Sequence, residues 1–218
     1  MKQTCKRILL AVDSRWQVGL RGKAVRGRDL WYGLAPLNAM RRRWSNLRVK
    51  MAYSFGSAAR RSVKLHLGCG ERHLEGYVNI DWRKTRATDL VCDIRRLPYP
   101  EESVNLIETY HVIEHMSKRD CEKALRHWHS LLRNGGRLII ECPNFDGAVR
   151  EYLDGREERI HNIFGLQRFE GDAHRFGYNF RRLKEVLERV GFSSVVEAAP
   201  QDYHKKEEPC MRVECIKR

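Results

Sequence analysis

The sequence VKLHLGCG, residues 63–70, sets the expectation for the rest of the chain. Apolar and polar side chains alternate and then stop at two glycines, which is typical of a buried β-strand that runs into a tight turn. Gly68 and Gly70 carry no Cβ, so backbone N–H groups can approach a ligand closely there. A second short run, VNID at 78–81, ends in Asp81, which can accept hydrogen bonds from a ribose diol. Together these residues predict a nucleotide-type pocket at the carboxyl ends of two neighbouring parallel strands.

The rest of the chain alternates short apolar runs with segments of helical periodicity. Helices are expected over 120–133, ended by the Asn-Gly-Gly sequence at 134–136, and over 182–190. A polar loop at 200–209 joins the last two apolar runs directly, so one of these two strands must run antiparallel to the other. The pattern predicts an α/β fold with a mostly parallel sheet and one antiparallel strand. Five further strands are expected at 89–92, 104–108, 137–142, 195–198 and 211–216.

Five successive motifs resemble those of class I S-adenosylmethionine-dependent methyltransferases. The likeness is greatest to the small type 11-like proteins that are often associated with surface-glycan biosynthesis, and it covers residues 62–218. The resemblance implies a Rossmann-like sheet of seven strands and S-adenosyl-L-methionine as the cofactor. The motifs are LHLGCG (65–70), VNID (78–81), CDIRRLPYPEESVNLI (92–107), HVIEH (111–115) and LLRNGGRLIIECPN (131–144).

The resemblance also implies a role for each residue of a cofactor cradle. Gly68 and Gly70 would pass under the amino-acid part of the cofactor, and Asp81 would hold the ribose hydroxyls. Asp93 would accept a hydrogen bond from the adenine amino group, with Ile94 packed on the ring; alternatively, Asp93 caps a turn or a helix. Asp81 follows Gly70 by eleven positions, against roughly twenty in the dinucleotide fingerprint. The expected cofactor-binding residues are Leu67, Gly68, Cys69, Gly70, Asp81, Asp93, Ile94 and His111.

The motif HVIEH, residues 111–115, follows the fourth strand at the end of the sheet where ligands bind in open α/β folds. On a helix, His111 and His115 would share a face with Glu114 beside them, a trio that can bind a divalent metal. Some small-RNA and quinone-pathway methyltransferases use a similar patch, but with a carboxylate where this chain has His111. We therefore expect no metal, and we expect His111 to face the cofactor or the acceptor.

Residues 145–180 follow the fifth strand and form the least regular segment of the chain. We expect this insertion to be a substrate lid that closes over the acceptor. Within it, His174 is the candidate general base and Asp172, two residues earlier, its orienter. The alternative is that His174 satisfies buried polar neighbours or faces solvent. With His111, these two residues make the expected catalytic set.

Charge is distributed unevenly along the 218 residues. Residues 1–61 hold 15 basic and 2 acidic residues, a net charge of +13, whereas the remaining 27 basic and 26 acidic residues give +1. This asymmetry indicates an anionic partner. Seven scattered cysteines without a C-x-x-C pair predict a reducing compartment, with neither a disulfide framework nor a zinc cluster. No apolar run reaches the length of about 18 residues that a membrane span needs, so we expect a cytoplasmic protein.

Residues 1–61 are expected to be a basic extension of a methyltransferase domain at 62–218. Within 29–52, apolar side chains recur at helical spacing while the arginines fall mostly off that stripe. Such a helix can pack on the domain, lie peripherally on an anionic membrane leaflet, or bind nucleic acid, and the last is the weakest of the three. The stripe consists of Leu37, Met40, Trp44, Leu47 and Met51.

The sequence therefore favours an S-adenosylmethionine-dependent methyltransferase that acts on an oxygen of a sugar, a glycolipid or a small metabolite. One alternative is an RNA or DNA methyltransferase that uses 1–61 as a clamp, and it predicts binding with a steep salt dependence. A second alternative is a non-catalytic binding module, although all the cradle residues are present. A nicotinamide-dependent oxidoreductase is disfavoured because His73 stands where the third glycine of G-x-G-x-x-G belongs.

Deleting residues 1–52 should abolish association with anionic liposomes or nucleic acid and leave cofactor binding intact, because the deleted segment carries most of the excess positive charge. Vesicle flotation, nucleic-acid gel shift and calorimetric titration with S-adenosylhomocysteine check this. Loss of cofactor binding in the deletion variant would instead assign the extension to the core of the domain.

Overall fold

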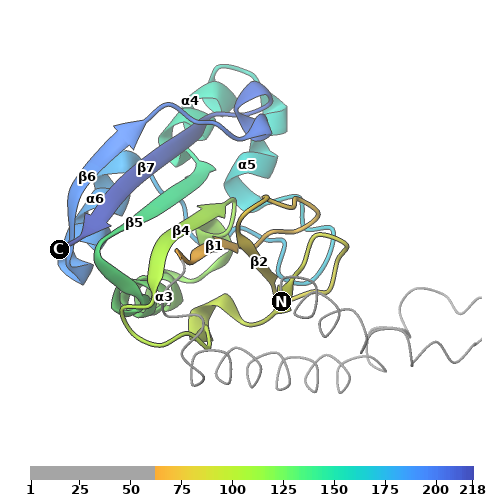
Figure 1. Ribbon diagram of the computed structural model, residues 1–218. Coiled ribbons are helices and arrows are strands. Elements are labelled where there is room, and N and C mark those ends of the chain that lie inside the picture. The colour runs from red at the N-terminus through yellow and green to blue at the C-terminus, as the bar shows by residue number, and fades with distance from the viewer. Residues whose placement is uncertain (1–61) are drawn as a thin grey trace, which may run out of the picture. The chain divides into compact units, whose positions relative to one another are not determined.

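The computed structural model describes residues 62–218, so the expectations about the basic extension and its amphipathic helix lie outside the described residues. The described part is a seven-stranded sheet with helices packed around it (Figure 1). Within this part, no helix combines the length and apolarity that a membrane span requires. The strands are β1 (Lys64–Leu67), β2 (Val78–Asp81), β3 (Leu90–Val91), β4 (Val104–Tyr110), β5 (Leu132–Pro143), β6 (Phe192–Ala198) and β7 (Cys210–Lys217).

The strand order is β3-β2-β1-β4-β5-β7-β6. Strands β1 to β5 are parallel to one another, and β7 is antiparallel to both β5 and β6. The predicted α/β fold, a mostly parallel seven-stranded Rossmann-like sheet with one antiparallel strand, is confirmed. From β1 the chain proceeds outward to β2 and β3 and then returns to place β4 on the other side of β1. Ligands of open α/β sheets bind at such a reversal of strand order.

The helices form where polar caps and apolar periodicity coincide. Ser117 caps the first turn of α3 by accepting from the Asp120 amide, and Asn179 caps α6 in the same way, accepting from the Arg182 amide. Gly191, in the left-handed conformation, ends α6. In Figure 1, α4 and α5 lie beyond the carboxyl ends of β4 and β5. The helices are α3 (Lys118–Leu131), α4 (Phe145–Leu153), α5 (Ile160–Phe164) and α6 (Phe180–Val190), with short 3-10 helices η1 (Ile94–Arg96), η2 (Ile113–His115), η3 (Glu157–Arg159) and η4 (Tyr203–Lys206).

The expectation that α3 ends at 134–136 is wrong. The helix ends at Leu131, and the backbone enters β5 directly, because Leu132 pairs with Val104 of β4. Two residues further along β4, Leu106 pairs with Arg137, so the Asn-Gly-Gly segment lies in a bulge of the strand. Strand pairing at the first residue of β4 thus overrides the local helix-stop signal.

The core lies between the sheet and α3, and Trp128 is its largest fully buried side chain. The indole Nε1 of Trp128 donates to the Ile94 carbonyl at 2.8 Å, which joins α3 to η1. Since η1 follows Asp93 and borders the predicted pocket, this bond connects the packing of the core to the position of the site.

Replacing Trp128 with alanine should lower the free energy of unfolding by about 3–5 kcal/mol, because a fully buried indole leaves a large cavity. Trp128→Phe keeps most of the packing and removes the bond to Ile94, so it should cost about 1–3 kcal/mol. Denaturant unfolding of both variants measures the difference. Equal losses in the two variants would show that a phenyl ring at this position restores no stability, so packing of the aromatic ring would contribute nothing.

Candidate functional site

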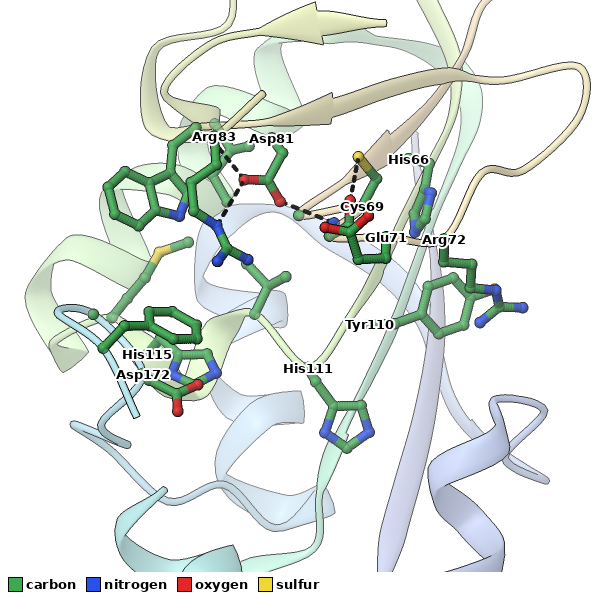
Figure 2. A pocket seen from close by; sticks show the side chains of 18 of the residues that line it. His66, Cys69, Glu71, Arg72, Asp81, Arg83, Tyr110, His111, His115 and Asp172 are labelled. Carbon is green, nitrogen blue, oxygen red and sulfur yellow. Dashed lines mark hydrogen bonds and ion pairs between the residues drawn. The ribbon is translucent and has the colours of Figure 1, made fainter. Parts of the chain in front are cut away.

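A cavity of about 880 Å³ opens at the carboxyl ends of β1, β2 and β4 (Figure 2). Its volume is in the range of small-molecule and cofactor sites. Of the eight residues expected to bind a cofactor, Leu67 alone lies outside the lining, because its side chain is fully buried in the core. The other seven line the cavity: Gly68, Cys69, Gly70, Asp81, Asp93, Ile94 and His111.

The glycine turn after β1 is shaped so that only glycine fits at its first position. Gly68 has a φ of +69°, and a Cβ there would lie 2.2 Å from Cγ2 of Val112. Gly70 also has a positive φ, of +51°, but the space around its missing Cβ is open to a distance of 4 Å. The turn is therefore packed against the chain at Gly68 and open at Gly70, as a cradle for a ligand requires.

Asp81 links the glycine turn to the end of β2. Its Oδ2 accepts from the Gly70 amide at 2.9 Å, and its Oδ1 accepts from the Arg83 amide at 2.8 Å (dashed lines in Figure 2). The carboxylate is buried yet lines the cavity. Each carboxylate oxygen keeps acceptor capacity beyond one amide, so the arrangement fits the predicted contact with ribose hydroxyls.

Asp93 caps η1, which is the alternative role that the sequence left open for it. Its Oδ1 accepts from the Arg95 amide at 3.0 Å, and the two carboxylate oxygens accept from the Arg95 guanidinium at 2.9 and 2.8 Å. Hydrogen bonds to Asp93 raise the pKa of Arg95. Asp93 and Ile94 both line the cavity, so capping and adenine recognition are compatible, and the adenine role stays a prediction.

His111 lies in a left-handed backbone conformation, with a φ of +52°, directly after β4. Its ring packs on that of His204, with 4.0 Å between centroids, and its Nδ1 lies 3.5 Å from Glu114 and 3.3 Å from Glu208. Burial alone would lower the pKa of His111, but its interactions with Cys210 and with the carboxylate of Glu114 together raise it to about 11. The raised pKa favours the imidazolium form of His111. Its Nδ1 faces Glu114 and Glu208, and its Nε2 lies 3.7 Å from Sγ of Cys210.

The expectation that His111, Glu114 and His115 share one helical face is wrong. The segment forms the short 3-10 helix η2, and His111 precedes it. Figure 2 shows His111 and His115 set apart and directed to different parts of the cavity. Glu114 points into the protein and is 3% exposed.

The expected pairing of Asp172 with His174 is also wrong. Asp172 accepts from the Arg168 guanidinium at 2.9 and 3.1 Å, while Nδ1 of His174 lies 2.9 Å from the Asn162 carbonyl. Residues two apart in an extended segment lie on the same side but roughly 6–7 Å apart along the chain, so a spacing of two does not by itself bring side chains into contact. Asp172 lines the cavity together with Arg168 and Phe169, and the lid role of 145–180 stays a prediction.

The connection between β6 and β7 brings to the cavity polar residues that were not among the predicted site residues. Asp202 is 2% exposed and bonds both to Arg72 and to Nδ1 of His204, and its own amide donates to Oε2 of Glu141 at 2.9 Å. Burial raises the pKa of Asp202, but the hydrogen bond to His204 and the charge of Arg72 outweigh it, so the pKa is lowered. An Asp-x-His pattern in a loop predicted to be polar was the available signal.

Comparison with known proteins agrees with this architecture. A family model described as "Methyltransferase domain" matches residues 65–140. A possible histamine N-methyltransferase from Thermotoga maritima has a similar structure, with a TM-score of 0.52 and 14% identity, covering 88% of this chain and 97% of that one. A SAM-dependent methyltransferase from Archaeoglobus fulgidus aligns with a TM-score of 0.50 and 14% identity over 81% of this chain and 94% of its own.

A curated relative is also similar over part of its length. An uncharacterized protein from Methanocaldococcus jannaschii is 25% identical over 96 residues, which are 44% of this chain and 41% of that protein. The match therefore spans less than half of the relative. The glycine turn, the acid at the end of β2 and the open cavity at the strand-order reversal fit S-adenosylmethionine, with Gly68, Gly70 and Asp81 as the residues that would hold it.

Asp81→Asn should weaken the binding of S-adenosylhomocysteine about tenfold to a hundredfold, because a hydrogen bond to a charged group is worth about 1.5–3 kcal/mol. The amide keeps the shape of the side chain and one oxygen acceptor, so the fold should survive. Calorimetric titration with thermal melting as the folding check tests this, with Asp154→Asn, exposed after α4, as the matched control. Unchanged affinity would remove Asp81 from the ribose site.

Proposed function

We propose that this chain, a methyltransferase with the class I fold that uses S-adenosylmethionine, methylates a hydroxyl oxygen of an uncharged sugar, glycolipid or small metabolite. The observation that carries the proposal is the Asp202–His204 pair, which lines the same cavity as the cofactor cradle. A buried carboxylate bonded to one imidazole nitrogen fixes the tautomer and leaves the other nitrogen as a proton acceptor.

Methyl transfer to a hydroxyl oxygen requires a base that removes the hydroxyl proton. S-adenosylmethionine supplies a methyl group that is already activated on a sulfonium. The remaining requirements are in-line approach of the oxygen and removal of its proton. With Nδ1–H of His204 donating to Asp202, Nε2 carries the lone pair that would take the hydroxyl proton. His111 is less suited to this role, because its ring nitrogens face Glu114, Glu208 and Cys210.

The charge of the cavity supports an uncharged acceptor. Five arginines and six acidic residues line it. Four of the arginines are already in ion pairs with aspartates of the same cavity, so the part of the lining that residues 62–218 provide holds no cluster of unpaired cations that would clamp a phosphate. These pairs are Arg72–Asp202, Arg83–Asp81, Arg95–Asp93 and Arg168–Asp172.

We further propose that the basic segment at 29–52 makes a peripheral contact with an anionic membrane. Its apolar stripe and its arginines suit the interface of a charged leaflet. Such a contact would hold the enzyme near a glycolipid acceptor. Nucleic acid is the alternative partner, and transfer to RNA or DNA would favour it.

Transfer of a labelled methyl group to a panel of acceptors tests the proposal. The panel contains neutral sugars, a neutral glycolipid, a primary amine and single-stranded RNA, each with S-adenosylmethionine at saturation. Label in a neutral hydroxyl compound is the expected result. Label only in the amine or only in RNA would overturn the assignment of the acceptor and leave the cofactor assignment standing.

His204→Ala should lower the methyl-transfer rate at saturating cofactor by about 10²–10⁴-fold, the usual contribution of a general base. Binding of S-adenosylhomocysteine should change little, since the predicted cradle lies on β1 and β2. Lys206→Ala, exposed on the same 3-10 helix, is the matched control. A rate equal to that of the wild type in His204→Ala would show that another group removes the proton.

A further inference from the structure

A second cluster of polar side chains borders the cavity and is separate from the Asp202–His204 pair. It consists of Glu114, His115 and His174. Glu114 and His115 belong to η2, and His174 comes from the segment between α5 and α6. One ligand atom from each of the three residues lies within 4.8 Å of the other two. Of the three side chains, that of His115 lines the cavity (Figure 2).

Glu114 is a buried carboxylate with no hydrogen-bond partner on either oxygen among the described residues. Its side chain is 4% exposed, and its ion-pair neighbour is Nδ1 of His111, at 3.5 Å. The same nitrogen lies closer to Glu208, at 3.3 Å. His111 is therefore shared between two carboxylates. A buried anion without hydrogen bonds is strongly unfavourable, so a further cation in direct contact with the carboxylate oxygens of Glu114 would complete the site.

The two imidazoles are held in the tautomer that leaves Nε2 as the ligand atom. Nδ1 of His115 lies 3.3 Å from the Ala173 carbonyl, and Nδ1 of His174 lies 2.9 Å from the Asn162 carbonyl. A carbonyl can only accept, so Nδ1 carries the proton in each ring and Nε2 keeps the lone pair. Metal-binding histidines are fixed by this kind of outer hydrogen bond to a backbone carbonyl.

We propose that Glu114, His115 and His174 bind a divalent transition-metal ion. Two imidazoles and one carboxylate suit Zn²⁺, Mn²⁺ or Fe²⁺, whereas Mg²⁺ and Ca²⁺ prefer oxygen ligands. Three protein ligands leave coordination positions open, and His115 places the ion at the border of the cavity. If the proposed function holds, an acceptor oxygen could fill such a position, where a metal lowers the pKa of a bound hydroxyl.

Two other groups of potential ligands lie near His111 and are less suited. In the first, Asp202 is already bonded to Arg72 and to His204. In the second, the ligand nitrogens of His111 are occupied, since Nδ1 faces Glu114 and Glu208 and Nε2 lies 3.7 Å from Sγ of Cys210. The cluster around Glu114 differs because its carboxylate is buried and lacks hydrogen bonds.

The test is metal binding by the full-length, tag-free protein after treatment with a chelator, without cofactor or acceptor. Titration with Mn²⁺ followed by electron paramagnetic resonance, and with Zn²⁺ by calorimetry, should give one ion per chain. His115→Ala and His174→Ala should each weaken binding by more than about 100-fold, since even outer-shell partners of a metal are worth 10–100-fold. His161→Ala, exposed on α5, is the matched control and should bind as the wild type does.

The absence of one-to-one binding in the wild type would overturn the proposal, and so would unchanged affinity in both histidine variants. His111 would then be the counter-charge of Glu114 among residues 62–218. Glu114→Gln gives a further measurement if a histidine variant fails to fold, with thermal melting as the criterion. Binding of the metal is measured without methyl transfer, so its failure and the failure of the proposed acceptor are separate outcomes.

Discussion

The buried carboxylate of Glu141, near the carboxyl end of β5, holds the sheet and the site together. Its Oε1 accepts from the Arg212 guanidinium of β7 at 2.6 Å, and its oxygens also accept from the amides of Gln201 and Asp202. The backbone carbonyl of the same residue accepts from the His111 amide at 2.9 Å. One residue therefore fixes the antiparallel strand, the segment that carries the Asp202–His204 pair, and the strained backbone at His111. Removing one partner from such a buried network is costly, because the other charge is left unpaired.

The cofactor side of the cavity depends on a different and more local constraint. The reversal of strand order between β1 and β4 leaves a crevice at their carboxyl ends. Gly68 can close against Val112 only because it has no Cβ, and Asp81 bonds the turn from the adjacent strand. The two halves of the cavity meet at His111. A local motif thus builds the cofactor half, while contacts between distant parts of the chain build the half assigned to the acceptor.

This division explains how much could be predicted from the sequence. Alternating apolar residues before Gly68 and an acid after β2 are short-range signals, and they gave the fold and the lining of the cofactor half. Asp202 and His204 reach the cavity only because β7 returns antiparallel beside β5, and no local pattern encodes that placement. Predictions from local sequence were wrong where tertiary contacts decide the structure. Pairing of Leu132 with β4 ends α3 earlier than predicted, and Asp172 binds Arg168 and not His174.

The position of β7 has a consequence for how the protein forms during synthesis. Among the described strands β7 is made last, yet it lies inside the sheet between β5 and β6. Until it emerges from the ribosome, β5 and β6 each present an unpaired edge, and the carboxylate of Glu141 lacks the guanidinium of Arg212. Unpaired edges are the surfaces through which incomplete chains associate. The nascent chain therefore exposes two strand edges until β7 is made. The Asp202–His204 pair, which lies between β6 and β7, takes its place in the cavity only when β7 joins the sheet.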